Sequence, residues 1–284
     1  MASEARTRAA RARAEDALVR FALLAGAHAQ DFVVIGGLNP DFLAPSAPAA
    51  HLGTTDVDLL FELGFVYDRE ELDFGWLDQV LRTSGFRTRR ETAGWQWDAV
   101  LGDTLVRLDL LCDVVDQPGR TIALPGADHA AVQNLDGPGA ALVQPVLRRL
   151  LVSSTVRADM DDAPESVGLR FASLGGYLTA KCAALSARAA PKDAYDLMFV
   201  LLYTPGGARE AARAIAEMPV MSHRRPPRSV ARAAMSMLLD PQGSCAGHFA
   251  AQMQEAGDEE PEDRLRADAA AGAALFLRTL DQNA

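Results

Sequence analysis

Cysteine is scarce in this sequence, and long hydrophobic runs are missing. Three cysteines occur among 284 residues without metal-ligand spacing, which argues against a disulfide framework and favours a reduced, cytoplasmic protein. No apolar run approaches the roughly 20 residues that a membrane-spanning helix needs. Residues 1–20 are rich in Ala and Arg but lack the apolar stretch of a secretory signal. We therefore expect a cytoplasmic location and no membrane partner.

Positive charge is also in short supply. The chain has 28 Lys and Arg against 38 Asp and Glu, a formal net charge of −10. A broad nucleic-acid-binding surface usually needs clustered Lys and Arg in excess. Basic residues do cluster locally at 87–91 and 223–228. The charge therefore argues against an extended nucleic-acid surface but leaves a local phosphate contact open.

The order of the predicted elements favours an α+β chain. Apolar residues make up 49% of the sequence, enough for a sizeable core. Strand patterns and one helix fill the first half, whereas the pattern turns helical from Phe171 onward. We predict a mixed sheet flanked by helices in residues 1–135 and a mainly helical domain in 136–284. The elements expected in the first half are strands at 32–37 and 55–63, a helix at 73–86, a hairpin at 95–115 and a strand at 119–126.

Two aspartates share one face of the predicted strand at 55–63. Side chains alternate along a strand, so Asp56 and Asp58 point the same way while Val57 and Leu59 point into the core. Neighbouring carboxylates repel each other unless a cation lies between them, and Mg²⁺ prefers oxygen ligands of this kind. The alternative is a solvated strand edge, because Asp-x-Asp is common by chance.

A third aspartate, Asp109, lies in the middle of the second strand of the predicted hairpin. Strand interiors disfavour aspartate, so this residue needs a partner. If its strand neighbours the strand of Asp56 and Asp58, three carboxylates converge, as in phosphoryl transfer with two metal ions. The alternative is a hairpin whose polar face is simply exposed to water.

The strand at 32–35 runs directly into Gly36 and Gly37. Glycine has no β-carbon, so the backbone N–H groups at such a strand end can approach a triphosphate closely. A Gly-Gly pair by itself is weak evidence for a phosphate-binding site. The evidence is stronger here because the pair precedes the three aspartates in the chain.

A lysine and two aspartates mark the helical half. Lys181 lies on an apolar helical stripe with Tyr177 and Leu185, so it either extends to solvent or points into a site that supplies anions. Asp193 and Asp196 lie one turn apart at a helix start after Pro191. Carboxylates favour helix N-termini in any case, so these residues by themselves indicate no site.

Together, Gly36-Gly37, "TDVD" at 55–58 and Asp109 resemble the core of the DNA polymerase β-like nucleotidyltransferase superfamily. The segment "LTAKCAALSARAAPKDAYDLMFVLL" at 178–202 is similar to the signature of AbiEii-like (MenT-type) nucleotidyltransferases. These motifs cover about 40% of the chain, roughly residues 30–115 and 170–203.

The resemblance implies an enzyme that moves NMP from an NTP to an acceptor hydroxyl and releases pyrophosphate. It implies that Asp56, Asp58 and Asp109 bind Mg²⁺ or Mn²⁺, and that Asp109 also helps to deprotonate the acceptor. Gly36, Gly37 and Thr55 would hold the phosphates, with Lys181 neutralising their charge. Asp193 or Asp196 would hold Lys181 or act near the attacking hydroxyl.

The resemblance also implies partners and a role. The acceptor is expected to be a tRNA 3′ end or a protein, and the role that of a toxin with a cognate antitoxin or of a phage-defence effector. The alternatives are a small-molecule acceptor, as in antibiotic-modifying relatives, or a non-catalytic nucleotide-binding module.

The sequence departs from the family pattern between the glycines and the aspartates. Gly37 and Asp56 are 19 positions apart, and the proline-containing segment 38–55 has to be accommodated as an insertion. His51 stands in the region where many relatives carry an arginine. It is expected either to contact a phosphate or base, or to be a capping or loop histidine.

Overall fold

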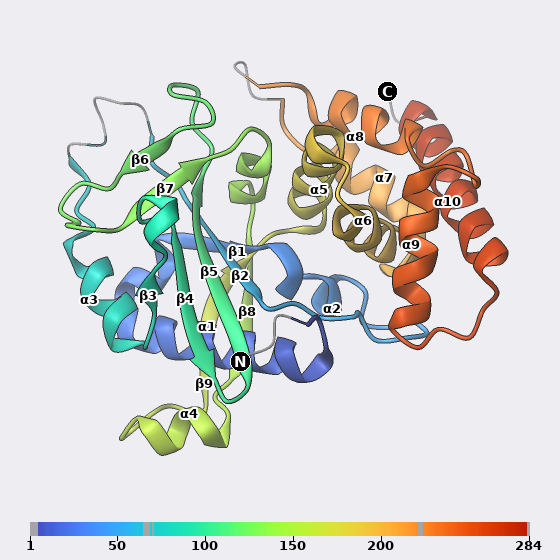
Figure 1. Ribbon diagram of the computed structural model, residues 1–284. Coiled ribbons are helices and arrows are strands. Elements are labelled where there is room, and N and C mark those ends of the chain that lie inside the picture. Colours follow the sequence, from blue (N-terminus) through green and yellow to red (C-terminus); the bar gives the residue numbers. More distant parts are fainter. Residues whose placement is uncertain (1–4, 65–68, 70, 221–223, 283–284) are drawn as a thin grey trace. The chain divides into compact units, whose positions relative to one another are not determined.

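The computed structural model describes residues 5–64, 69, 71–220 and 224–282 (Figure 1). Of the basic segment 223–228, His223 lies outside the described residues. The chain forms two compact units: Met1–Leu38 with Gly53–Phe171, and Asn39–Leu52 with Ala172–Ala284. Residues 136–171 thus belong with the sheet, whereas the sequence pattern assigned them to the helical domain.

The first unit is built around one mixed sheet. Among the described residues nine strands take part, in the order β3-β4-β5-β2-β1-β9-β8, and the β6–β7 pair joins at β5. The strands are β1 (Phe32–Ile35), β2 (Asp56–Phe61), β3 (Arg87–Thr88), β4 (Gln96–Leu101), β5 (Thr104–Cys112), β6 (Thr121–Ala123), β7 (Ala131–Asn134), β8 (Val146–Leu151) and β9 (Ser166–Phe171). The helices and helical turns of this unit are α1 (Arg8–Ala25), η1 (Gly26–Gln30), η2 (Gly36–Leu38), α3 (Gly75–Thr83), η4 (Arg90–Thr92), η5 (Pro138–Leu142) and α4 (Ser154–Asp159).

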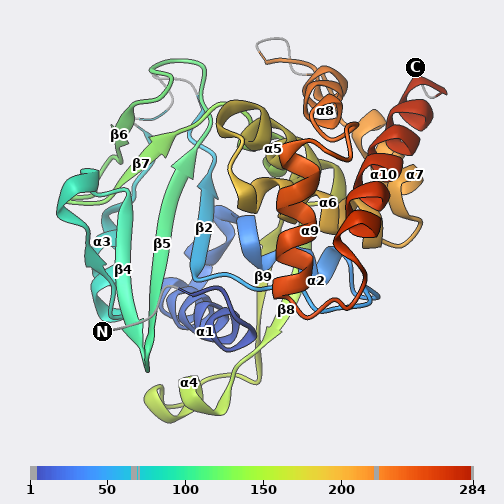
Figure 2. The same ribbon diagram turned by 45° about the vertical axis from the view of Figure 1, so that its right-hand side comes forward.

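Strand direction is set by the connections. β4 and β5 form the hairpin predicted at 95–115, with Leu101 opposite Thr104 across a two-residue turn. β2 runs antiparallel to β1 but parallel to β5, and Figure 2 shows β4, β5 and β2 side by side. The sheet is therefore mixed, as the sequence predicted.

One face of the sheet is apolar and is covered by α1 and α3. The ring of Phe21 on α1 packs on Phe32, and Phe32 packs on its register partner Phe61. Val57 and Leu59 belong to the same face and are fully buried. Because side chains alternate along β2, Asp56 and Asp58 are left on the opposite face.

Helix α1 is buried along one side. Thr7 caps it, accepting a hydrogen bond from the backbone N–H of Ala10 at 3.0 Å. Ala14, Leu18 and Phe21 on one side of the helix are fully buried. The run of small alanines lets this arginine-rich helix lie close against the sheet.

The second unit is helical. Its helices are α2 (Pro40–Leu43), α5 (Leu174–Arg188), α6 (Pro191–Tyr203), α7 (Gly207–Ala216), α8 (Pro227–Ser236), α9 (Ser244–Glu255) and α10 (Glu262–Gln282). Helix α6 is central to it, with buried residues all along its length from Asp193 to Leu201. The α+β class predicted from the order of the elements is confirmed.

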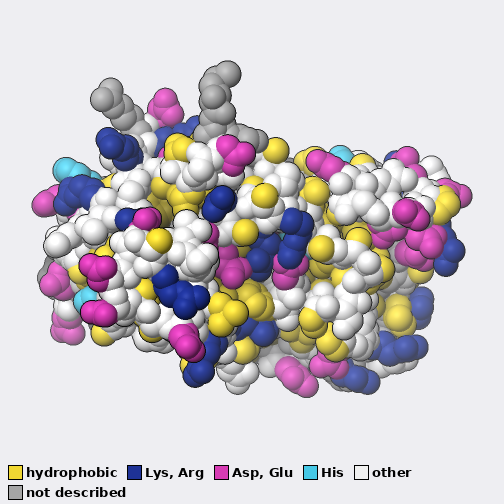
Figure 3. Space-filling view, turned by 90° about the horizontal axis from the view of Figure 1, so that it is seen from below, with side chains coloured by type: hydrophobic (Ala, Val, Ile, Leu, Met, Phe, Trp, Pro, Cys, Tyr) yellow, Lys and Arg dark blue, Asp and Glu magenta, His cyan; other side chains and the backbone are white. Residues whose placement is uncertain are grey.

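Two surface properties bear on function. Every helix within the described residues is too short or too polar to cross a membrane. On the face in Figure 3, Lys and Arg side chains are interspersed with Asp and Glu. This mixture is typical of a solvated surface and differs from the continuous basic face of a nucleic-acid-binding protein.

Candidate active site

The end of β1 lies directly against the second aspartate of β2. Gly36 has a φ of +73°, and the carboxylate of Asp58 occupies the space that a β-carbon would need. A β-carbon on Gly37 would lie 2.6 Å from Cβ of Thr54. Packing alone therefore requires glycine at both positions. The sequence suggested a different reason, the close approach of a triphosphate to the backbone.

Asp58 and Asp109 are neighbours on parallel strands. Their Cα atoms are register partners in the β2–β5 pair, so both side chains lie on the same face of the sheet. Asp56 is one step away, opposite Arg107, with its carboxylate 3.8 Å from the guanidinium. The three predicted acids thus share one face, with Asp58 and Asp109 side by side and Asp56 beside an arginine.

Asp109 is strongly perturbed. Burial, followed by the charges of Asp58 and Asp56, raises its pKa to about 8, against the smaller lowering effects of Gln96 and Arg107. The amide of Gln96 donates a hydrogen bond to its Oδ1 at 3.0 Å. Without a cation, Asp109 therefore holds a proton at neutral pH. Perturbations of this kind are concentrated at functional sites.

The donor chemistry of this face suits a divalent cation. Three carboxylates that repel one another offer only oxygen ligands, which is what Mg²⁺ and Mn²⁺ require. As they stand, the described residues contain no three His, Cys, Asp or Glu side chains gathered closely enough to hold a metal. The face is therefore a set of donors on neighbouring strands rather than a preformed cage.

Thr54 and Thr55 fix the start of β2. The hydroxyl of Thr54 accepts a hydrogen bond from the backbone N–H of Asp56 at 3.0 Å. The carbonyl of Thr55 accepts one from the N–H of Arg107 at 3.0 Å. The two threonines therefore hold the backbone that carries Asp56.

Sequence reasoning did not identify Gln96 and Asp98 as members of this face. In the hairpin register Gln96 pairs with Asp109 and Asp98 with Arg107, and the Asp98 carboxylate is 3.6 Å from Arg107. The two-residue turn at Gly102 and Asp103 sets this register. Counting back from the turn would have placed both residues beside the carboxylates.

The remaining predicted residues meet inside the second unit. The Lys181 ammonium lies 2.7 Å from Asp196 and 3.7 Å from Asp193, and Arg188 pairs with Asp193 through two hydrogen bonds. Both aspartates are almost fully buried. The pairing of Lys181 with an aspartate is thus seen, and Lys181 is neither solvent-directed nor an unneutralised cation.

The segment that the sequence marked as an insertion belongs to this unit. His51 is completely buried, and its Nε2 forms a hydrogen bond with Asp196 at 3.0 Å. Its ring stacks on Tyr195 and meets Phe199 edge-on. The Tyr195 hydroxyl accepts a hydrogen bond from the N–H of Leu52. His51 is therefore a loop histidine, as one of the two expectations had it, and it anchors its segment to α6. Its complete burial leaves no surface for the other expected role, contact with a phosphate or base.

Comparison with known proteins gives little beyond this geometry. No family model matches the chain, and no curated protein matches it. One solved structure, the "putative nucleotidyltransferase from H. pylori", is similar over 96% of this chain and 95% of its own, with a TM-score of 0.44 and 10% identity. Because that likeness is too distant to carry an argument, function has to be inferred from the site itself.

Proposed function

We propose that the protein is a metal-dependent nucleotidyltransferase. The observation that carries this proposal is the pair Asp58 and Asp109, adjacent on parallel strands, with Asp58 packed against the Gly36 end of β1. The third acid, Asp56, completes an oxygen donor set on the same face. Of the motifs that resemble nucleotidyltransferases, those of the first unit, Gly36-Gly37, residues 55–58 and Asp109, lie together at this point.

In the proposed reaction the acceptor hydroxyl attacks the α-phosphorus of an NTP, and pyrophosphate leaves. Asp56, Asp58 and Asp109 would hold Mg²⁺ or Mn²⁺, which supplies neutralisation of the triphosphate charge. Asp109, ionised when the cation is bound, would accept the proton of the hydroxyl. Gln96 keeps the Asp109 carboxyl oriented through its hydrogen bond.

Phosphate contacts are proposed for the backbone of Gly36 and Gly37 and for Thr55. Lys181 is kept as a proposed phosphate contact on the basis of the resemblance alone, since its charge is matched by Asp196 and Asp193 within the second unit. In this proposal Asp193 and Asp196 position Lys181.

The proposed acceptor is a tRNA 3′ end or a protein hydroxyl, and the proposed role is that of a toxin or phage-defence effector. Both come from the sequence resemblance. The formal net charge of −10 favours an acceptor bound over a small area rather than along an extended nucleic acid.

A transfer assay tests the proposal. Each α-³²P-labelled NTP is incubated with the protein and Mg²⁺ or Mn²⁺, in the presence of total tRNA, lysate proteins or candidate small molecules. We expect label to reach one acceptor class, with transfer abolished by EDTA and reduced about 100-fold or more in Asp58→Asn and Asp109→Asn.

The matched control is Asp103→Asn in the exposed turn of the same hairpin, which should transfer label at the wild-type rate. NTP binding without transfer to any acceptor would favour the non-catalytic module. Transfer that survives Asp58→Asn and Asp109→Asn would refute the assignment of the site.

A further inference from the structure

A row of alternating charges crosses the sheet beside Asp58 and Asp109. Arg87 on β3 is the register partner of Asp98 on β4. Asp98 pairs in turn with Arg107 on β5, and Arg107 pairs with Asp56 on β2. Register partners on neighbouring strands lie on the same face of a sheet. The row therefore ends on Asp56, one of the proposed cation ligands, and Arg107 is the basic residue that faces it.

Arg107 lies between two carboxylates. Its Nη1 is 3.8 Å from Oδ1 of Asp56, and its Nε is 3.6 Å from Oδ1 of Asp98. Both separations are those of ion pairs and exceed the roughly 2.7–2.9 Å of a charge-assisted hydrogen bond. The three side chains are 22–26% exposed, so water and salt screen their charges less than at an open surface. Arg107 is thus attracted by charge from both sides.

Asp98 is the carboxylate that draws Arg107 toward β4. Its Oδ1 is buried, and within the described residues this oxygen accepts no hydrogen bond. A buried carboxylate oxygen without a donor is unfavourable, and the guanidinium of Arg107 offsets part of that cost. Because β4 and β2 flank β5 on opposite sides, attraction to Asp98 acts against attraction to Asp56.

A divalent cation at the aspartates would meet Arg107 as a like charge. Asp58 and Asp109 are register partners one step further along β2 and β5, so a cation that they share with Asp56 would lie close to the guanidinium. The two positive charges would repel each other and attract the same carboxylate. In the described part of the chain the aspartates are not gathered into a metal cage, as expected where one of them is drawn toward an arginine.

We propose that Arg107 competes with the divalent cation for Asp56, and that Asp98 limits this competition by attracting Arg107. Arg107 is then a positioning residue that lowers the affinity of the site for its cation, and Asp98 acts through it. This role rests on the proposed function, because it takes the three aspartates as cation ligands. Neither Arg107 nor Asp98 belongs to the motifs from which the site was predicted.

The test measures cation affinity directly and needs no substrate. The full-length protein is freed of metal with EDTA, desalted and titrated with Mn²⁺, and the unbound ion is followed by electron paramagnetic resonance. Measuring at pH 8, near the Asp109 pKa of about 8, keeps proton competition at that residue to about twofold. We expect Arg107→Gln to bind Mn²⁺ about tenfold more tightly than wild type, and Arg107→Lys, which keeps the charge, to stay within about threefold of wild type.

Asp98 is tested in the same titration. Asp98→Asn should bind Mn²⁺ about threefold more weakly than wild type, because Arg107 then faces Asp56 alone. The same substitution in an Arg107→Gln background should have a smaller effect. An equal loss in both backgrounds would show that Asp98 acts on the cation directly and would overturn its proposed role.

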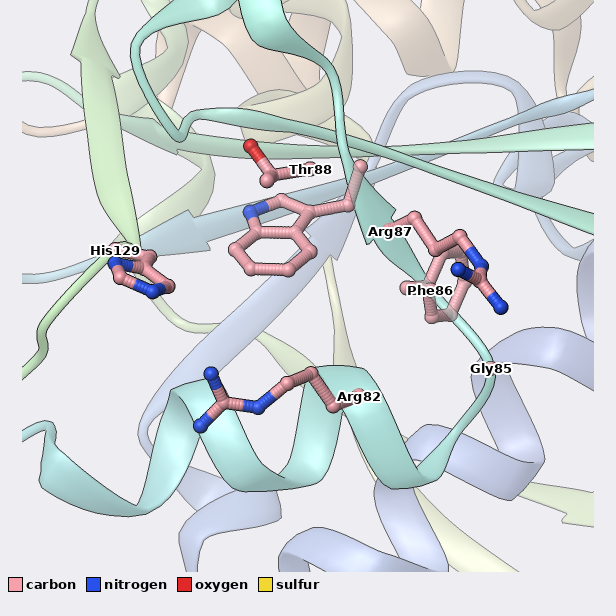
Figure 4. Close-up of a pocket in the computed structure, with 7 residues that line it drawn as sticks. Arg82, Gly85, Phe86, Arg87, Thr88 and His129 are labelled. Atoms are coloured by element: carbon pink, nitrogen blue, oxygen red, sulfur yellow. The ribbon is translucent and has the colours of Figure 1, made fainter.

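Arg82→Gln is the matched control for the loss of one positive charge. Arg82 lies on α3, which covers the opposite face of the sheet, and Figure 4 shows it extending along that helix toward His129. This variant should bind Mn²⁺ like wild type. Melting temperatures in EDTA show which variants are folded. If Arg107→Gln does not fold, Asp98→Asn decides the matter, and an unchanged affinity in that variant overturns the proposal.

Asp58→Asn separates this proposal from the proposed function. If Asp58→Asn abolishes Mn²⁺ binding but folded Arg107→Gln binds no more tightly than wild type, the competition is refuted and the cation site stands. If Arg107→Gln binds more weakly, Arg107 supports the site and the proposal is likewise refuted. If Asp58→Asn binds Mn²⁺ as tightly as wild type, the cation lies elsewhere and both proposals fail.

Discussion

At the scale of single residues, the contact between Gly36 and Asp58 decides how the acidic face is built. The positive φ of Gly36 is unfavourable for any other residue, and the Asp58 carboxylate fills the space beside its Cα. The aspartate can occupy its position on the sheet only because the strand before it ends without a side chain.

Replacing Gly36 by alanine should displace Asp58. The new methyl group would overlap the carboxylate and impose a positive φ on an L-residue, a cost of about 1–3 kcal/mol. We expect nucleotide transfer to fall at least about tenfold in Gly36→Ala, with a lower melting temperature. Gly85→Ala is the control for the cost of a positive φ alone. Gly85 has a φ of +92°, but a β-carbon there would meet no atom within 4 Å. If Gly36→Ala and Gly85→Ala lower the melting temperature equally and both keep wild-type nucleotide transfer, the contact between Gly36 and Asp58 is not needed for activity.

The raised pKa of Asp109 makes the stability of the cation-free protein depend on pH. In the unfolded chain this carboxyl ionises near its ordinary value of 3.8, whereas in the folded protein it keeps its proton up to about pH 8. The stability from this group is therefore full below pH 4 and is lost as the pH rises to about 8.

Asp109→Asn removes this dependence, because the amide stays neutral. We expect it to raise the free energy of unfolding in EDTA by more at pH 8 than at pH 5, with a difference of up to about 4 kcal/mol for three pH units at about 1.4 kcal/mol per unit. Denaturant unfolding at both pH values measures this. A variant that is equally destabilised at pH 5 and pH 8 would show that Asp109 is not protonated in the folded protein.

At the scale of elements, α3 and the segment around His51 each depend on one buried polar group. Asp78 ties α3 to the backbone of residues 128–130, and His51 ties residues 39–52 to α6 through Asp196 and two aromatic rings. Neither connection is local in sequence, and each joins a loop to a helix.

His51→Ala should destabilise the protein strongly. It leaves Asp196 without one of its hydrogen bonds and opens a cavity between Tyr195 and Phe199, for a combined cost of about 2–4 kcal/mol. His28→Ala is the control, because His28 is about half exposed and its removal should cost less than about 1 kcal/mol. Equal effects of the two substitutions in denaturant unfolding would contradict the anchoring role of His51.

Asp78→Ala should loosen the loop that carries His129. Three backbone N–H groups lose their acceptor, and we expect a loss of about 2–4 kcal/mol together with faster amide exchange at residues 128–130. Gln79→Ala, at the exposed neighbouring position on α3, should leave both unchanged. Unaltered exchange in Asp78→Ala would show that other contacts hold this loop.

At the scale of the whole molecule, the limits of the units differ from those that the sequence suggests. Strand β9 pairs with both β1 and β8, so residues 146–171 complete the sheet on the far side of β1. A chain cut at residue 135 would leave β1 as an unpaired edge, and such edges promote aggregation.

Two fragments of the first unit test this boundary. In both, residues 39–52 are replaced by a Gly/Ser linker of equal length, since that segment belongs to the second unit. We expect the fragment that ends at residue 171 to be soluble and to unfold cooperatively, and the fragment that ends at residue 135 to aggregate. The reverse outcome would mean that β8 and β9 are dispensable. Size-exclusion chromatography and circular dichroism separate the two cases.

Local pattern alone determined a large part of this protein. Alternation placed Asp56 and Asp58 on one face of β2, the two-residue turn at Gly102 gave the β4–β5 hairpin, and helical spacing gave α3, α5 and α6. These features depend on interactions between residues close in sequence, so the sequence contains all the information needed to predict them.

Tertiary structure decided the rest, because it depends on pairs that are far apart in the chain. The parallel register of β2 and β5 brings Asp58 beside Asp109, and burial raises the pKa of Asp109; no local pattern specifies either. The same holds for His51, whose polar ring is buried against α6 from 145 positions away. The sequence alone therefore identifies the candidate carboxylates, whereas their proximity depends on the pairing of β2 with β5 in the folded sheet.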